Sequence, residues 1–495
     1  MEKNYFLKKV LQACVLFFLI ITANVFSQVG IGTVAPETSS ILDVSSTTKG
    51  MLTPRMTTAQ RLAITTPADG LMVYDIDLKA FHYFNSSTVV WTIVNSAATG
   101  RLKFKRIRSS DVLATVLASE LAAGGTTKYL LDSNTYYEIN GTITFDNPID
   151  LNNAYLAGLD TNHDVIFRNG NLFVGSTGGS IRNVTLNVPS GNVFNISGAI
   201  SQNFIFRDSV VANCANVGSI TGLGLVFVSI VQFVGNINGI TYNNISQLLL
   251  SNIGWFGNNQ GTYEKLTGTF GLVQKQGGFS QVEGTAIGFD VSANPIISGD
   301  AVMETVVFTG ATSGKYVNGY TGAGTYAGYN FNNNWNIRCA GIPIEADPFT
   351  TGSVYLDRIP TSPAGFLTDT NATYKVPGTT ISTNLFRMDG ATSNRLTYLG
   401  KRPRTFSVSA SISFEGATGS ADLLFYYVKS AVGGTPTTFI TSSETFIDSN
   451  NTNIQSIAVL GTVTLANGEY VELCVRRLNG TNKSFTFRSY NMSIE

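Results

Sequence analysis

The chain has 495 residues with 32 basic and 32 acidic side chains, and its formal net charge is zero. This balance gives no electrostatic argument for binding nucleic acid or an anionic membrane. With only two histidines, His82 and His163, the sequence excludes a histidine-rich metal site and gives no basis for a serine–histidine–aspartate triad. The low charged fraction of 13% and the 49 glycines are typical of a secreted β protein.

Residues 1–27 are predicted to be a signal peptide. Three lysines precede an apolar run from Val15 to Ile21, and cleavage is expected between Ser27 and Gln28. The apolar run is too short to span a membrane comfortably, and no later segment is a candidate span. We therefore expect a secreted or cell-surface protein of the bacterial outer envelope, without a membrane span once the signal peptide is removed.

Residues 28–97 are predicted to form a small attachment module, a β-meander with one helix. Thr57 and Gln60 form a capping-box pattern before a short helix that Pro67 would end. Two further runs, Leu71–Tyr74 and Ala80–Phe84, would pair across a polar turn. The motifs of the module are Gln28-Val-Gly-Ile-Gly-Thr33, Ile41-Leu-Asp-Val44, Thr48-Lys-Gly50, Pro54-Arg-Met-Thr57, Ala59-Gln-Arg61, Gly70-Leu-Met-Val-Tyr-Asp75 and Trp91.

These motifs resemble a module of secreted Bacteroidota proteins. The shorter pattern from Gly30 to Val44 is also similar to repeats in phage and bacterial fibre proteins. The resemblance implies a surface or fibre context, and it says nothing about chemistry.

Residues 98–125 are predicted to be a connector with a capping helix. Ser110 would cap a run from Asp111 to Ala123 that has apolar residues at helical spacing and ends at Gly124. The terminal coil of a stacked β structure needs such a cover, because it exposes apolar edges.

Residues 126–350 are predicted to form a right-handed parallel β-helix that serves as a shaft. Short β-rich runs separated by glycine and asparagine return about every 20 to 25 residues, which suits one coil. Asparagines at the turns, such as Asn258 and Asn259, could form amide ladders between coils. The opening coils resemble pectin-lyase-like β-helix proteins, including phage tailspikes. Between Asp164 and Glu264 the charged residues are Arg168, Arg182, Arg207 and Asp208.

This near-neutral stretch argues against a hydrolase site in the central groove. A polysaccharide hydrolase needs two carboxylates about 5 to 10 Å apart, and the stretch contains one acid, Asp208. At the entrance of the solenoid, Asp160, His163 and Asp164 lie in one turn sequence, and turn chemistry is the favoured interpretation. They are the candidates for a catalytic role if the chain is an enzyme. No metal is expected, since the cysteines have no metal-binding spacing. No cofactor is expected either, since Gly30 and Gly32 lack the helix and third glycine of a dinucleotide fingerprint.

Four aromatic residues near the exit are the candidates for ligand binding: Tyr320, Tyr326, Tyr329 and Trp335. Lying among glycine and asparagine, they would suit stacking on a sugar. The competing interpretation, which we favour, is that they stack inside the last coils.

Residues 351–400 are predicted to be a linker, and residues 401–495 an antiparallel jelly-roll head. Phe406 to Phe414 alternates apolar residues with serine, which indicates a strand with one buried face. The region resembles the trimeric group that includes complement C1q and tumour-necrosis-factor-like heads, through Leu465–Leu473 and the last strand Phe485–Glu495. That resemblance implies a homotrimer.

The sequence therefore predicts an all-β, secreted, homotrimeric fibre-like protein with a structural or adhesive role. Its expected partners are copies of itself and a surface glycan or envelope protein. One alternative is a phage or prophage tail fibre or tailspike for host recognition. Another is a β-helix polysaccharide depolymerase, either a glycosidase or a lyase.

Overall fold

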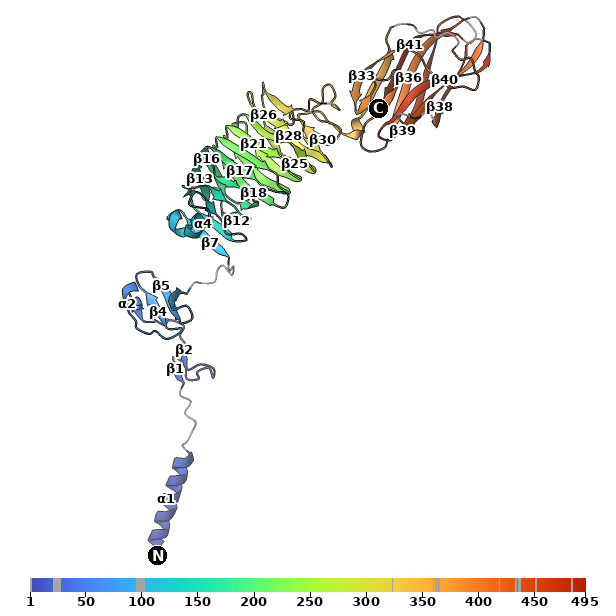
Figure 1. Cartoon of the computed structure of the whole chain (residues 1–495). Coiled ribbons are helices and arrows are strands. Elements are labelled where there is room, and N and C mark those ends of the chain that lie inside the picture. The colour runs from blue at the N-terminus through green and yellow to red at the C-terminus, as the bar shows by residue number, and fades with distance from the viewer. Residues whose placement is uncertain are drawn as a thin grey trace. The chain divides into compact units, whose positions relative to one another are not determined.

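The computed structural model of the chain describes residues 2–20, 28–94, 103–322, 324–358, 360, 366–417, 419–431, 434, 438–449, 452–481 and 484–495. These residues divide into two compact units, Met1–Gly100 and Arg101–Glu495, which are described one at a time. Strands dominate the second unit, whereas the first unit combines one long helix with short strands (Figure 1). The prediction of an all-β fold is confirmed.

The first unit begins with a helix and ends with a small sheet. No described helix, α1 (Glu2–Ile20) included, is long and apolar enough to cross a membrane. A parallel pair and a four-stranded sheet with one helix follow: β1 (Val29–Ile31) and β2 (Leu42–Val44), then β3 (Arg55–Met56), α2 (Thr58–Leu62), β4 (Met72–Asp75), β5 (Ala80–Asn85) and β6 (Val90–Ile93). Strand β3 pairs parallel to β4, so the sheet is not the simple meander expected.

The predicted capping box begins helix α2. Gln60 N donates to Thr57 Oγ1 at 3.2 Å, and Thr57 N donates to Gln60 Oε1 at 2.9 Å. The helix is fixed to the sheet by a buried ion pair between Arg61 and Asp75 at 2.9 Å. Two donors at the start of the helix are thus satisfied reciprocally, as the sequence pattern predicts.

The second unit opens with a parallel β-solenoid, here residues 104–345. One sheet contains β7 (Phe104–Arg108), β9 (Tyr136–Asn140), β12 (Tyr155–Ala157), β15 (Gly179–Arg182), β18 (Asn203–Ala212), β20 (Leu225–Val234), β22 (Gln247–Trp255), β25 (Leu272–Gln281), β28 (Ala301–Thr309) and β30 (Trp335–Ala340), with β10 (Ile143–Thr144), β13 (Val165–Asn169) and β16 (Thr185–Ser190) beside this path. A second sheet contains β8 (Tyr129–Leu130), β11 (Ile149–Asp150), β14 (Phe173–Gly175), β17 (Asn192–Ser197), β19 (Asn216–Thr221), β21 (Asn238–Asn243), β23 (Thr262–Thr267), β26 (Ile287–Asp290) and β29 (Lys315–Asn318). A separate two-stranded parallel sheet pairs β24 (Thr269–Phe270) with β27 (Ile296–Ile297).

The register gives the coil length directly. Asn203 pairs with Leu225, and Leu225 pairs with Gln247, so these coils contain 22 residues each. Later coils are longer, and Ala301 pairs with Trp335, 34 residues on. The predicted period of 20 to 25 residues therefore holds for the middle coils, whereas the last coil carries an inserted loop.

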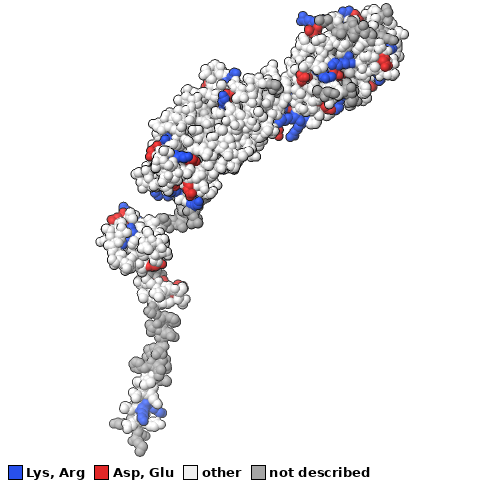
Figure 2. Space-filling view, viewed as in Figure 1, with Lys and Arg blue, Asp and Glu red and all other residues white. Residues whose placement is uncertain are grey.

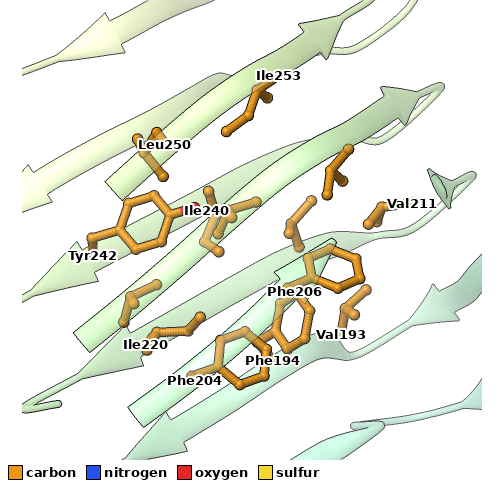
Figure 3. Packing of buried hydrophobic residues seen from close by; sticks show 14 of the residues in the cluster. Val193, Phe194, Phe204, Phe206, Val211, Ile220, Ile240, Tyr242, Leu250 and Ile253 are labelled. Atoms are coloured by element: carbon orange, nitrogen blue, oxygen red, sulfur yellow. The ribbon is translucent and has the colours of Figure 1, made fainter. Parts of the chain in front are cut away.

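The interior of the solenoid is filled by stacked apolar side chains (Figure 3). Phe194 packs edge-on against both Phe204 and Phe206, with ring centroids 5.4 Å from each. Further along, Trp255 stacks on Phe233 at 3.9 Å and on Tyr263 at 5.0 Å. Because these side chains point inward from parallel strands in register, each coil covers the apolar face of the one before.

Asparagine ladders tie the coils together at their turns. Asn236 Oδ1 accepts a hydrogen bond from Cys214 N at 3.0 Å, and Asn236 Nδ2 donates to Asn259 Oδ1 at 2.9 Å. A second ladder joins Asn216 and Asn238 at 2.9 Å. Buried turn amides are satisfied in this way, as expected from the asparagine-rich turns.

The predicted connector, residues 98–125, differs in detail from the prediction in its described part. Two short helices, α3 (Leu113–Val116) and α4 (Ala118–Ala123), replace the single helix expected. The N-cap residue is Val112 rather than Ser110, and it makes no side-chain cap. Strand β7, placed in the connector by the sequence, pairs with β9 and belongs to the solenoid sheet.

Residues 351–495 form two antiparallel sheets around one core, here called the sandwich. The first sheet has the order β33 (Thr380–Phe386), β31 (Thr351–Leu356), β41 (Phe485–Ile494), β36 (Arg404–Gly416) and β39 (Gln455–Leu465). The second has the order β34 (Met388–Asp389), β35 (Leu396–Tyr398), β40 (Glu469–Gly480), β37 (Ala421–Ala431) and β38 (Thr438–Ser449), with β32 (Tyr374–Lys375) on β40. Buried residues of both sheets form one apolar cluster.

The prediction of a linker over residues 351–400 is wrong. Strand β31 lies between β33 and β41, with Gly352 paired to Ile494, so this segment contributes strands to both sheets. A composition rich in proline and threonine concealed these short strands, and β31 also pairs with β41, more than a hundred residues further along the chain. The sandwich therefore begins at β31.

Candidate functional site

The entrance residues Asp160, His163 and Asp164 lie together, and they hold a turn. Asp164 is buried and accepts hydrogen bonds from the backbone N–H groups of Gly141 at 2.8 Å, Leu159 at 2.6 Å and Asp160 at 3.0 Å. Its carboxylate links two coils, which is the turn role favoured from the sequence.

Asp160 lies at the surface of the same turn. Its carboxylate accepts from Asn162 N at 2.9 Å and contacts His163 Nδ1 at 2.6 Å. The backbone hydrogen bond from Asn162, followed by the His163 contact, lowers the pKa of Asp160. A general acid would need a raised pKa, so the environment of Asp160 does not suit that role.

Tyr320 and Trp335 lie inside the last coil rather than on a ligand-binding surface. Trp335 Nε1 donates to Tyr320 Oη at 3.0 Å, and Tyr320 Oη donates to Pro295 O at 2.8 Å. Burial raises the pKa of Tyr320 to about 12. Their hydrogen bonds and burial match the interior stacking that was the competing interpretation.

Tyr326 and Tyr329 pack on the sandwich. The ring of Tyr329 stacks on Phe386 with centroids 4.2 Å apart, and Tyr326 meets Phe386 edge-on at 5.4 Å. Phe386 ends strand β33. These aromatic residues therefore join the long loop of the last coil to the sandwich.

A cavity of about 510 Å³ opens beside this contact, where the last coils meet the sandwich. Sequence reasoning did not single out this cavity. It is lined by Asp300, Ala301, Val302, Asn334, Trp335, Asn336, Asp347, Pro348, Arg387, Lys401, Arg402, Pro403 and Arg404. The run Lys401-Arg402-Pro403-Arg404 was a visible signal, but its acidic partners lie some 50 and 100 residues earlier in the chain.

Arg387 is the buried centre of the cavity wall. Its guanidinium pairs with Asp347, donates to Trp335 O, and donates to Glu345 O at 3.0 Å. Lys401 Nζ contacts Asp300 Oδ1 at 2.7 Å. These contacts reach from the sandwich to the solenoid, so the cavity is bounded by ordered groups from both.

The first unit carries a different feature, a dense apolar surface here called the N-terminal apolar surface. Among the described residues 29–94, 18 large hydrophobic side chains are exposed. Met51, Leu52, Tyr74 and Phe81 line a small cavity of about 290 Å³ within it. The described part of the solenoid exposes far fewer such side chains along a much longer stretch.

In the described part of the chain, no group of three or more histidine, cysteine, aspartate or glutamate side chains is placed to hold a metal ion. The cysteines described in the solenoid and sandwich, Cys214, Cys339 and Cys474, are buried free thiols.

Comparison with known proteins gives one informative match. Residues 30–109 match a phage tail like trimerisation region. The matched trimerisation region contains strand β7 and 17 of the 18 exposed side chains of the N-terminal apolar surface, and it covers less than a fifth of the chain. No curated protein matches the chain.

Among solved structures, the chain is similar to the enzymatically active domain of tailspike protein 4 of bacteriophage CBA120. The two share 10% identity over 90% of this chain and 77% of that one, with a TM-score of 0.21. A score this low carries no argument about fold or activity.

Proposed function

We propose that the chain is the subunit of a homotrimeric, phage-tail-like fibre that binds a cell surface. The observation that carries this proposal is the coincidence of the N-terminal apolar surface with the matched trimerisation region. The match favours a fibre of the phage-tail type over a general adhesin.

The N-terminal apolar surface supports assembly on physical grounds. Large side chains such as Leu52 and Ile41 are about four-fifths exposed in one chain. So many exposed large apolar side chains in one small module, four of which line one cavity, are typical of an interaction surface. Three copies around a closed axis would remove it from water and leave no open edge for further growth.

The solenoid suits the role of a shaft. Its middle coils are nearly free of charge, as the white surface in Figure 2 shows, and they carry no paired carboxylates. Each coil contacts only its neighbours, which gives an extended element whose length depends on the number of coils.

The sandwich supports a trimeric jelly-roll head of the C1q or tumour-necrosis-factor type. From β35 to β41 the chain passes repeatedly between the two sheets, as jelly rolls do. The outer face of β36 and its neighbours carries hydroxyl groups, with Thr405 and Thr464 in contact at 2.8 Å and Ser353 and Ser493 at 3.0 Å. A face almost free of charge is suited to meeting an identical face.

Sedimentation tests the assembly. We expect the full chain without residues 1–27 to sediment as a trimer at micromolar concentration. Leu52→Asp should weaken association at least tenfold, because it places a charge in the buried interface. The matched control is Leu159→Asp, which changes an equally exposed leucine on the solenoid and should have no effect. A monomer at micromolar concentration would overturn the proposal.

Surface binding and export belong to the same proposal. Labelled fibre should adhere to target cells, and periodate oxidation of their glycans should abolish adhesion.

Export would begin with removal of the signal peptide, so the secreted chain should start at Gln28 by mass spectrometry. Ser27 itself lies outside the described residues. No specific observation favours polysaccharide cleavage.

A further inference from the structure

We propose that the cavity between the solenoid and the sandwich binds a carboxylate-bearing sugar residue. This inference rests on the proposed function, because it names the class of surface glycan that the fibre would recognise. A cavity of about 510 Å³ lies within the usual size range of small-ligand sites.

The charges of the cavity do not cancel. Its lining contains four basic side chains and two acidic ones. Asp300 is matched by Lys401 at 2.7 Å, and Asp347 is matched by Arg387. The guanidinium groups of two further arginines remain without a carboxylate partner among the described residues, which leaves the cavity with a net positive charge.

These two arginines are Arg402 and Arg404, and hydrogen bonds fix the surroundings of both. Arg404 Nη1 donates to the backbone oxygens of Asp347 at 3.1 Å and Thr350 at 3.2 Å, and the guanidinium lies 4.7 Å from the Phe406 ring. Asp347 Oδ2 also accepts from the backbone N–H of Arg402 at 3.2 Å.

The guanidinium of Arg402 is exposed and has no hydrogen-bond or ion-pair partner in the described part of the chain. It lies near enough to Asp300 to assist Lys401, the main cause, in lowering the pKa of that carboxyl. An arginine on an anchored backbone with free donors is suited to bidentate pairing with a carboxylate.

The remaining wall matches a sugar better than a bare anion. Asn336 is exposed and Asn334 uses one amide hydrogen on Ile297 O at 3.1 Å, so both have capacity left for sugar hydroxyls. Pro348 and Pro403 supply apolar surface beside them. Basic, amide and apolar groups thus converge on one space, and Figure 2 shows basic residues gathered where the solenoid meets the sandwich.

Calorimetry on the full mature chain tests this inference. The probes are the trisaccharides of galacturonate and guluronate, a trimer of sialic acid, the methyl ester of trigalacturonate, and inorganic phosphate. We expect at least one acidic trisaccharide to bind, and its affinity to fall as salt is raised. The neutral ester and phosphate should each bind at least tenfold more weakly.

Two variants locate the site. Arg402→Gln should weaken binding roughly tenfold or more, as the loss of a charge-assisted hydrogen bond does. Asn336→Ala should weaken it by a smaller factor. The matched control, Arg182→Gln, alters an exposed arginine on the solenoid and should leave binding unchanged. Since Arg402 and Asn336 are exposed, neither change should lower the unfolding midpoint.

Three outcomes would overturn the inference: no acidic trisaccharide binds, phosphate binds as tightly as the sugar, or Arg402→Gln and Asn336→Ala both bind like the unaltered chain. Sedimentation of the same samples keeps this failure separate from failure of the proposed function. A trimer that adheres to cells without preferring acidic sugars contradicts only the assignment of this cavity.

Discussion

Glu345 shows how one buried carboxylate couples the last coil to pH. It is fully buried and accepts hydrogen bonds from Asn330 N at 2.7 Å and Phe331 N at 2.8 Å. Burial is the largest influence and raises the pKa of Glu345 to about 7, against the opposing effect of these hydrogen bonds. The folded state therefore holds this proton more tightly than the unfolded chain does.

The sign of the pH dependence follows from this. The stabilising contribution is complete below the unfolded pKa of about 4.5 and is lost as pH rises through about 7. We expect the loss to be on the order of 3 kcal/mol. The unfolding midpoint of the full chain should thus be lower at pH 8 than at pH 5, and Glu345→Gln should reduce that difference. An equal pH dependence in the variant would contradict the argument.

Single residues were predictable where local chemistry decides their role. Thr57 and Gln60 form the capping box, and Asp164 holds its turn, because both patterns act over a few neighbouring residues. The environments of Arg387 and Glu345 were not predictable, since their burial depends on contacts between separate parts of the second unit. The cavity where the solenoid meets the sandwich was missed for the same reason.

At the scale of elements, the short helices α3 and α4 cover the first coils of the solenoid. Leu117, which joins them, is completely buried, and it belongs to the same apolar cluster as Ile107 and Ile139 of strands β7 and β9. The helices thus supply the cover that the first coil lacks on its open side.

Removing Leu117 should loosen one end of the solenoid only. Leu117→Ala should cost about 2 to 5 kcal/mol locally, because a cavity replaces a fully buried side chain. Hydrogen exchange should become faster in β7 and β9 and stay unchanged in β28, since coils contact only their neighbours. The control is Val112→Ala, which truncates an exposed residue of the same segment. Equal acceleration in β28 would show that the solenoid unfolds as one block.

Elements were predictable in proportion to their regularity. The alternation from Phe406 to Phe414 gives strand β36 because one residue in two faces the core. Strand β31 has a short, proline-flanked sequence and pairs with the far end of the chain, so no local pattern marks it. The broken helix at Leu117 also escaped, because both halves continue the same apolar spacing.

At the scale of the whole molecule, the proposal contains two separate trimer contacts in one chain. One uses the N-terminal apolar surface, and the other uses the sandwich. Contacts that are linked in one chain reinforce each other through effective concentration, often by a factor of about 10² to 10⁴. The full fibre should therefore resist dissociation far better than either contact alone.

Truncation measures this reinforcement. Residues 101–495, the compact second unit, should still associate through the sandwich but should dissociate at a concentration at least a hundredfold higher than the full chain. Analytical ultracentrifugation over a dilution series gives both dissociation constants. Identical constants would mean that the N-terminal apolar surface contributes nothing to assembly.

Ten strands stack along one sheet from β7 to β30, so the length of the solenoid changes in whole coils. Adjacent strands lie about 4.8 Å apart, so each additional coil extends the solenoid by that step. Inserting or deleting one 22-residue coil between β18 and β22 would change the reach while both ends kept their contacts. Under the proposed function, a change in the number of coils would alter the distance to the bound surface without altering the residues that bind it.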